Sequence, residues 1–147
     1  ALDAGVEWVD MEEDVQEDDR IPFFEDAASS GSKILLSHHD FSSTPDASSL
    51  QRKLSRMAEK KPDAVKIVTY AESPEDNLRV LNLIPFGLNE LGMKVIAFCM
   101  GAEGRWSRVV SLLLGSPWTY VQLADNRPTA PGQFTPHQVQ SLLEALQ

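Results

Sequence analysis

The feature of the sequence that most limits its fold is a regular alternation of short apolar runs with helical segments. The apolar runs, rich in residues that favour strands, begin near Val6, Lys33, Ala64, Lys94 and Trp118. Their starts are about 24 to 31 residues apart, which matches successive strand–helix–strand crossovers. Near-continuous apolar strands between amphipathic helices predict a parallel sheet that is covered by helices.

Two α/β architectures contain a sheet of this kind, an open doubly wound sheet and a TIM (β/α)8 barrel. No Gly-rich phosphate loop of a dinucleotide-binding sheet follows the first strand, which favours the barrel. A complete barrel takes about 250 residues, whereas this chain has 147. We therefore expect residues 1–147 to form the C-terminal part of a single barrel, incomplete here with five βα units, whose first three units are missing upstream of Ala1.

Several helix ends are marked by their capping residues. Residues 73–76, Ser-Pro-Glu-Asp, predict that a helix starts near residue 74. Pro85 and Gly87 are expected to interrupt this helix, and Gly92 to end it. Residues 135–138 have the pattern of a capping box at the start of a last helix that packs inward. The predicted apolar stripes of two helices are Leu50, Leu54 and Met57, and Val139, Leu142, Leu143 and Leu146.

Charge narrows the range of partners. Thirteen Lys and Arg against 22 Asp and Glu give a net charge of −9, which disfavours binding to nucleic acid. Eight of the acids lie within residues 7–19, and such a run predicts a solvated loop.

No run approaches the roughly 20 apolar residues of a membrane-spanning helix, so we expect no membrane partner. The single cysteine, Cys99, cannot form an intramolecular disulfide and favours a reducing compartment such as the cytoplasm.

Lys66 interrupts an otherwise apolar strand run. Period-two alternation puts Lys66 on the opposite face from Val65 and Ile67. If those two residues pack under the helices, the amine points into the barrel, where removal from water favours the neutral form that attacks a ketone. The alternative is a structural lysine near a strand end that reaches water or pairs with a carboxylate.

His38 and His39 come at the carboxyl end of their strand, the end at which barrel enzymes build their active sites. Neighbours on a strand point to opposite faces, so only one of the two faces the interior. That imidazole is a candidate general acid–base, and the alternative is a structural residue that is hydrogen-bonded at the strand end. Because adjacent histidines diverge and His137 lies in the last helix, the sequence predicts no metal site.

Arg108 and the loop at residues 128–133 follow the last two strand runs, so both are expected near the carboxyl ends of the strands. A guanidinium there suits bidentate binding of a substrate carboxylate, although single arginines are commonly surface residues. The Pro- and Gly-containing loop is either a lid or a plain connector.

Three strand ends together resemble those of type I 3-dehydroquinate dehydratase. Residues 34–45, ILLSHHDFSSTP, are similar to a signature of that family and pick out His39. The AVKIV strand at residues 64–68 is similar to the strand that carries the Schiff-base lysine of the family. The first strand resembles the family's Asp-x-Glu strand end, which implies that Asp10, with Glu12, is a supporting acid near the histidine.

The resemblance continues to the end of the chain. Residues 100–108, followed by Leu-Gly-Ser-Pro at residues 114–117, resemble the arginine-bearing segment of the family. Ala-Pro-Gly-Gln at residues 130–133 is similar to its closing loop. Thr129 stands where the family usually has serine, which keeps the hydroxyl and adds a methyl group.

This resemblance implies a lyase of the shikimate route to aromatic amino acids. Such an enzyme dehydrates 3-dehydroquinate to 3-dehydroshikimate with neither a metal nor an organic cofactor. It implies that Lys66 forms the Schiff base and that His39 moves the protons. Arg108 would bind the carboxylate of the small-molecule substrate, while Gln133 and Thr129 would close the lid.

Other functions remain open from the sequence. One is another Schiff-base barrel enzyme, such as a class I aldolase. A second is a non-catalytic barrel fragment that needs an N-terminal half, either fused or supplied by a partner. A homodimer is also left open. The resemblance further implies that two glutamates of the site lie on upstream strands, so this portion alone is expected to be incomplete.

Overall fold

The computed structural model describes residues 5–123, 130 and 132–146. Within them, four strands form one parallel sheet in the order β1-β2-β3-β4. The strands are β1 (Trp8–Glu12), β2 (Lys33–His39), β3 (Ala64–Tyr70) and β4 (Lys94–Met100). The predicted starts of β2, β3 and β4 are confirmed, and β1 begins shortly after the predicted Val6.

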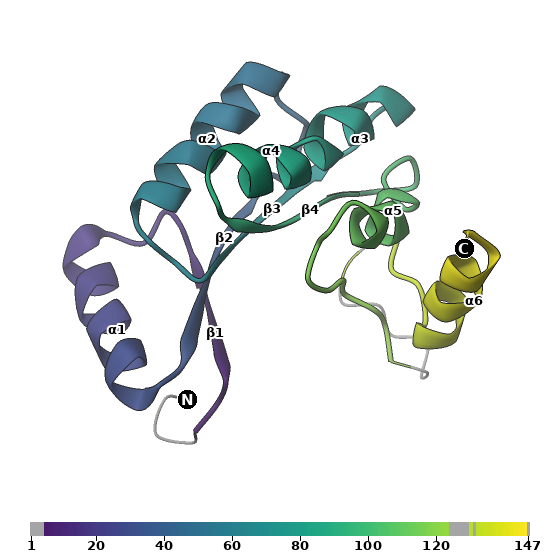
Figure 1. The fold of residues 1–147 in the computed structure, drawn as a ribbon. Helices are drawn as coiled ribbons and strands as arrows, with labels where there is room; N and C mark the ends of the chain where they lie inside the picture. The colour runs from purple at the N-terminus through teal and green to yellow at the C-terminus, as the bar shows by residue number, and fades with distance from the viewer. Residues whose placement is uncertain (1–4, 124–129, 131, 147) are drawn as a thin grey trace.

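Helices alternate with these strands, which confirms an α/β fold. They are α1 (Glu17–Ser30), α2 (Ala47–Glu59), α3 (Pro74–Leu81), α4 (Leu83–Glu90), α5 (Ser107–Leu113) and α6 (Pro136–Leu146). Figure 1 shows α2, α3 and α4 on one side of the sheet, with α1 and α6 at opposite ends of the molecule. No helix in the described part of the chain is long and apolar enough to cross a bilayer.

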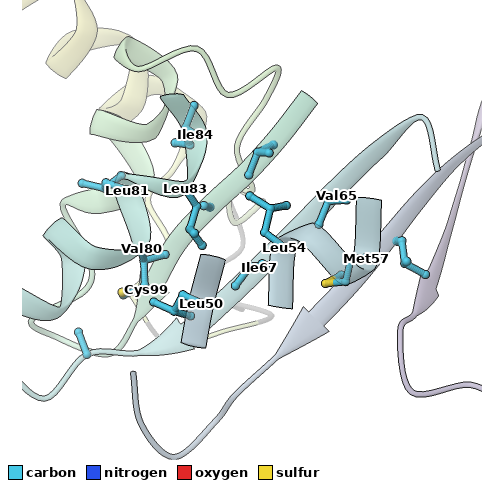
Figure 2. Packing of buried hydrophobic residues seen from close by; sticks show 14 residues of the cluster. Leu50, Leu54, Met57, Val65, Ile67, Val80, Leu81, Leu83, Ile84 and Cys99 are labelled. Atoms are coloured by element: carbon cyan, nitrogen blue, oxygen red, sulfur yellow. The ribbon is translucent and has the colours of Figure 1, made fainter. Parts of the chain in front are cut away.

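The main hydrophobic core lies between the sheet and the three helices α2, α3 and α4 (Figure 2). The predicted stripe of α2, formed by Leu50, Leu54 and Met57, is buried in this core. Val65 and Ile67 of β3 reach it from the sheet side and are fully buried. Removal of this apolar surface from water stabilises the fold at roughly 25 cal/mol per Å².

The long helix predicted after β3 is divided into α3 and α4 at Asn82. A capping box at Ser73 starts α3, as predicted. Pro85 has no N–H to donate to the carbonyl of Leu81, so a single helix cannot continue without loss of a hydrogen bond. With α4 starting at Leu83, the proline falls in its first turn, where backbone N–H groups have no partner within the helix.

The prediction of a fifth strand from Trp118 is wrong for the described residues 118–123, which form no strand. Trp118 and Tyr120 instead pack on the face of the sheet opposite the main core. The ring of Trp118 lies 4.9 Å from that of Trp8 in β1, edge to face. The segment is therefore held by packing of its aromatic rings on the face of the sheet opposite the main core, and not by backbone pairing with an edge strand.

The acidic run at residues 7–19 is not the solvated loop that its charge predicts. Residues 8–12 form β1, and residues 17–19 form the first turn of α1. Carboxylates are favoured in the first turn of a helix because they interact with its exposed N–H groups and its dipole. On β1, alternation places the side chains of Asp10 and Glu12 on the same face of the sheet.

The last helix, α6, confirms the predicted capping box but not the predicted inward packing. The N–H of Thr135 donates to Oε1 of Gln138 at 2.9 Å, and the N–H of Gln138 donates to Oγ1 of Thr135 at 3.3 Å. Val139 is buried, whereas Leu142 and Leu146 are exposed. The helix packs beside α5, and one short helix covers only part of its apolar stripe.

Candidate active site

The face of the sheet opposite the helices carries the strand residues of the predicted site. Near the amino ends of the strands this face is apolar, and Leu35, Ala64 and Ile96 are buried there. Toward the carboxyl ends it becomes polar and opens into a pocket of about 240 Å³. The pocket is lined by Lys66, His39, Arg108 and Gln133 from the predicted site and by apolar residues that include Val68, Phe98, Met100 and Tyr120.

Lys66 projects from the middle of β3 onto this face. The residue is only 6% exposed, and its Nζ donates to Oδ2 of Asp10 at 2.6 Å. The other carboxylate oxygen of Asp10 accepts a hydrogen bond from the hydroxyl of Ser37. The ring of Tyr120 lies over the amine, with its centroid 4.9 Å from Nζ. Both interpretations of Lys66 from the sequence therefore hold in part, because the amine is buried at the pocket and is also paired with a carboxylate.

The two histidines at the end of β2 point in opposite directions, as the alternation predicts. His39 lines the pocket, its Nδ1 lies 2.6 Å from Oε1 of Glu12, and its ring stacks on that of Phe41. Its second nitrogen, Nε2, is thus the one left for a bound molecule. His38 contacts Glu13 at 3.4 Å, away from the pocket. Burial, reinforced by the nearby charge of Lys53, lowers the pKa of His38 below its ordinary value.

The two acids of β1 are arranged differently from the prediction. Asp10 was expected beside the histidine, but the structure places it against Lys66. Glu12 takes the position beside His39. The register explains the difference: Asp10 pairs with Leu35, two residues before Ser37, and Ser37 pairs with Lys66. Asp10 and Glu12 therefore each contact a β2 residue two positions after their register partner, and Lys66 lies level with Ser37.

Arg108 reaches the pocket from the first turn of α5. It is 2% exposed, and its guanidinium lies over the ring of Phe98, 4.4 Å from the centroid. Burial lowers the pKa of Arg108 to about 10, which still leaves the side chain positively charged at neutral pH. A guanidinium buried in the wall of a pocket suits an anionic group.

Hydrogen bonds to the end of β4 fix the start of α5. The hydroxyl of Ser107 accepts from the N–H of Cys99 at 2.8 Å and donates to the carbonyl of Gly104 at 2.6 Å. A Cβ atom at Gly104 would lie 2.3 Å from the carbonyl oxygen of Met100, so this close turn requires glycine. The position of Arg108 is therefore tied to the backbone of the sheet.

The C-terminal loop contributes Ala130 and Gln133 to the pocket, and Gln133 is buried. Gly132 has a φ of 82°, and a Cβ there would lie 2.9 Å from the carbonyl oxygen of Gly101. The loop thus lies directly against the turn that follows β4. Thr129, the other predicted residue of this loop, lies outside the described residues.

The site residues that were not predicted from the sequence include Phe98 and Tyr120 of the pocket and Ser37, which bonds to Asp10. Phe98 follows Ile96 on the same face of β4, so alternation along that strand was a usable signal for it. Ser37, two residues before His39 on β2, has the same signal. Tyr120 lies outside any strand and had none. Within the described residues, no group of three or more His, Cys, Asp or Glu side chains is suited to a metal ion.

Comparison with known proteins gives consistent matches. The chain is 50% identical to 3-dehydroquinate dehydratase of Syntrophobacter fumaroxidans over 141 residues, covering 96% of this chain and 58% of that protein. It is 42% identical to the 3-dehydroquinate dehydratase of Pyrococcus abyssi, covering 79% of this chain and 50% of the relative. The chain thus spans about half the length of the curated relatives it matches.

Solved structures agree with this likeness. The 3-dehydroquinate dehydratase of Geobacillus kaustophilus superposes with a TM-score of 0.87 at 29% identity, over 99% of this chain and 56% of that one. The type I 3-dehydroquinate dehydratase of Clostridium difficile, solved with covalently modified comenic acid, gives a TM-score of 0.87 at 26% identity, over 99% and 57%. The sheet and its helices therefore have the TIM-barrel-like α/β fold of these enzymes. Because the family model for type I 3-dehydroquinase matches residues 1–147, this chain belongs to the type I 3-dehydroquinase family.

Proposed function

We propose that the protein containing this chain is a hydro-lyase that dehydrates 3-dehydroquinate to 3-dehydroshikimate through an imine on Lys66. The observation that carries the proposal is the pocket in which a buried amine, an imidazole and a buried guanidinium meet. The names of the relatives support the same reaction. The reaction belongs to the shikimate route, which leads to aromatic amino acids.

The first step is attack of Lys66 Nζ on the ketone carbon of the substrate. Loss of water then gives a protonated imine, which withdraws electrons and acidifies the neighbouring C–H bond. Because the lysine itself supplies this electron sink, the proposed reaction requires neither a metal nor an organic cofactor.

The second step is proton transfer by His39. Glu12 holds its Nδ1 at 2.6 Å, so Nε2 is the nitrogen that removes the proton next to the imine. The same nitrogen then returns a proton to the departing hydroxyl, which leaves as water. Hydrolysis of the imine releases the product and restores Lys66.

The remaining residues position the substrate. The buried charge of Arg108 binds the substrate carboxylate, and its planar group sets the orientation of the ring. Gln133 closes the C-terminal side of the pocket over the bound ring. This closure excludes water from the imine.

We further propose that residues 1–147 form the C-terminal part of a single (β/α)8 barrel. β1 pairs with β2 on one side, and no strand of the described residues pairs with its other edge. Upstream strand–helix units, fused or separate, would cover that edge and complete the site. The buried free thiol of Cys99 favours a reducing compartment such as the cytoplasm.

The proposal is tested by reduction with borohydride. The protein that contains this chain is mixed with 3-dehydroquinate, reduced, and analysed by peptide mass spectrometry. We expect a covalent adduct on Lys66, and loss of both adduct and turnover in Lys66→Ala. Unchanged turnover by that variant would contradict the proposal. An adduct formed with a sugar phosphate but not with 3-dehydroquinate would indicate a class I aldolase instead.

A further inference from the structure

The carboxylate of Asp10 contacts the amine that the proposed reaction uses. Lys66 Nζ donates to Oδ2 of Asp10 at 2.6 Å, so an ammonium proton already lies in a hydrogen bond to a base. An ammonium group cannot attack a ketone until it loses that proton. We infer that Asp10 accepts the proton of Lys66 and returns it during imine formation, an inference that rests on the proposed function.

The geometry around Asp10 fixes both of its carboxylate oxygens. Oδ2 accepts from Lys66, and Oδ1 accepts from the hydroxyl of Ser37. The three residues come from β1, β2 and β3, so the contact is built on three adjacent strands rather than on a loop. A carboxylate oriented by two donors is suited to exchange a proton with one particular atom.

His39 is not the partner of the amine in this arrangement. Its Nδ1 is held by Glu12, the acid two residues after Asp10 on the same face of β1. The two acids of β1 therefore serve different residues, Asp10 the amine and Glu12 the imidazole. This division leaves His39 available for the proton on carbon while Asp10 moves the proton on nitrogen.

The proton balance of imine formation closes with Asp10 alone. The carboxylate takes one proton from the ammonium of Lys66, and the free amine forms the C–N bond as the carbonyl π electrons move to oxygen. A second proton passes from that nitrogen to the oxygen and gives a neutral carbinolamine. Asp10 then returns its proton to the hydroxyl, the C–O bond breaks, and water leaves. The products are a protonated imine and an ionised Asp10, so no other proton donor or acceptor is consumed.

Exposure supports this role for the acid. Lys66 is almost fully buried, whereas the side chain of Asp10 is 44% exposed. Asp10 also lines a second pocket, of about 350 Å³, which shares Tyr120 with the first. The carboxylate thus lies between the buried amine and space that water can reach. After water has left the carbinolamine, the negative charge of the Asp10 carboxylate stabilises the positive charge of the imine.

The test follows the rate of imine formation directly. The full protein is mixed with 3-dehydroquinate, quenched with borohydride at increasing times, and the adduct on Lys66 is measured by mass spectrometry. We expect Asp10→Asn to form the adduct about 100-fold more slowly at neutral pH.

A matched control is Glu7→Gln, which also removes an acid from a lysine pair at β1. Glu7 lies 3.1 Å from Lys33, outside both pockets, and the variant should form the adduct at the wild-type rate. A wild-type rate in Asp10→Asn would overturn the inference and leave the proposed function intact. Absence of any adduct in the wild-type protein would overturn both.

Circular dichroism of Asp10→Asn checks that the variant folds. If it does not fold, Ser37→Ala decides the question, since it frees one carboxylate oxygen without removing the acid. Adduct formation about threefold slower in Ser37→Ala supports the inference, and a wild-type rate overturns it.

Discussion

The two faces of the sheet differ in what their side chains do, although both are built from the same strands. On β3, Val65 and Ile67 face the helices and are fully buried in an apolar core. Lys66 lies between them in the sequence and faces the pocket, where its partner is a carboxylate. Alternate residues of one strand thus belong to the core and to the pocket. Substitutions in the core should therefore change stability with little effect on activity, and substitutions in the pocket should change activity with little effect on stability.

The pocket face is itself divided along the strands. Near their amino ends it is closed by apolar residues, such as Leu35 and Ile96. Its charged and polar residues lie farther along, toward the carboxyl ends, where the pocket opens. The helix face has no comparable gradient of charge along β3. The site is therefore confined to one face and one end of the sheet.

The largest effect that separates the two faces is expected from Ile67→Ala. The side chain is fully buried, so its truncation leaves a cavity and should lower the free energy of unfolding by about 2–4 kcal/mol. Chemical denaturation measures this loss. Activity per folded molecule should stay at the wild-type level, because Ile67 does not line the pocket. A large loss of kcat at unchanged stability would show that the two faces are not independent.

A smaller effect is expected on the pocket face from Arg108→Lys. The charge is retained but the planar, bidentate group is lost, so KM for the substrate should rise about tenfold, with a smaller change in kcat. Steady-state kinetics test this expectation. Arg52→Lys is the control, because Arg52 is an exposed arginine of α2 that bonds to Ser48 and Ser49. Equal KM values for Arg108→Lys and wild type would show that Arg108 does not bind the substrate carboxylate.

The smallest effect concerns pH and the cluster around Glu13, which also lies away from the pocket. Burial opposes ionisation of Glu13, but its hydrogen bond to Lys53 and nearby positive charges outweigh this and lower its pKa below 4.5. Burial and the charge of Lys53 lower the pKa of His38 below 6.5. Both shifts favour the forms present at higher pH, ionised Glu13 and neutral His38. Stability should therefore fall on acidification, first below 6.5 from His38 and then through the lowered pKa of Glu13.

Thermal unfolding measured from neutral to acidic pH checks this order. The charged and titratable groups facing the cluster are Glu12, Glu13, His38, Asp40, Lys53 and Lys60. His38→Gln should flatten the upper part of the profile, and Glu13→Gln the lower part. Profiles in both variants that match the wild type would show that the cluster does not contribute to the pH dependence.

Much of the fold was predictable because local pattern and tertiary packing agree. β2, β3 and β4 start where their apolar runs start, and the stripe of α2 is buried as its spacing predicts. The segment from Trp118 has an equally apolar run but no strand. A run of this kind specifies burial, whereas a strand also requires backbone pairing with a neighbouring strand, which the run itself does not encode.

The site was predictable to the level of which face a residue occupies. Alternation along β2 and β3 put His39 and Lys66 on one face, and the structure places both at one pocket. Which acid contacts which side chain was not predictable, because these contacts depend on the register between strands that are distant in the sequence. Asp10 was expected near the histidine, yet it contacts Lys66, and Glu12 contacts His39 instead.

The bonds made by Ser107 have a consequence for how such a pocket can change over time. One hydroxyl, that of Ser107, bonds to both the N–H of Cys99 and the carbonyl of Gly104. The direction of α5, which carries Arg108, is therefore fixed by the end of β4. Insertions elsewhere on the surface can then accumulate without rotating the guanidinium of Arg108, the proposed carboxylate-binding group. The orientation of Arg108 thus depends on the sheet and the start of α5, whereas sequence changes in the outer loops can alter other parts of the pocket.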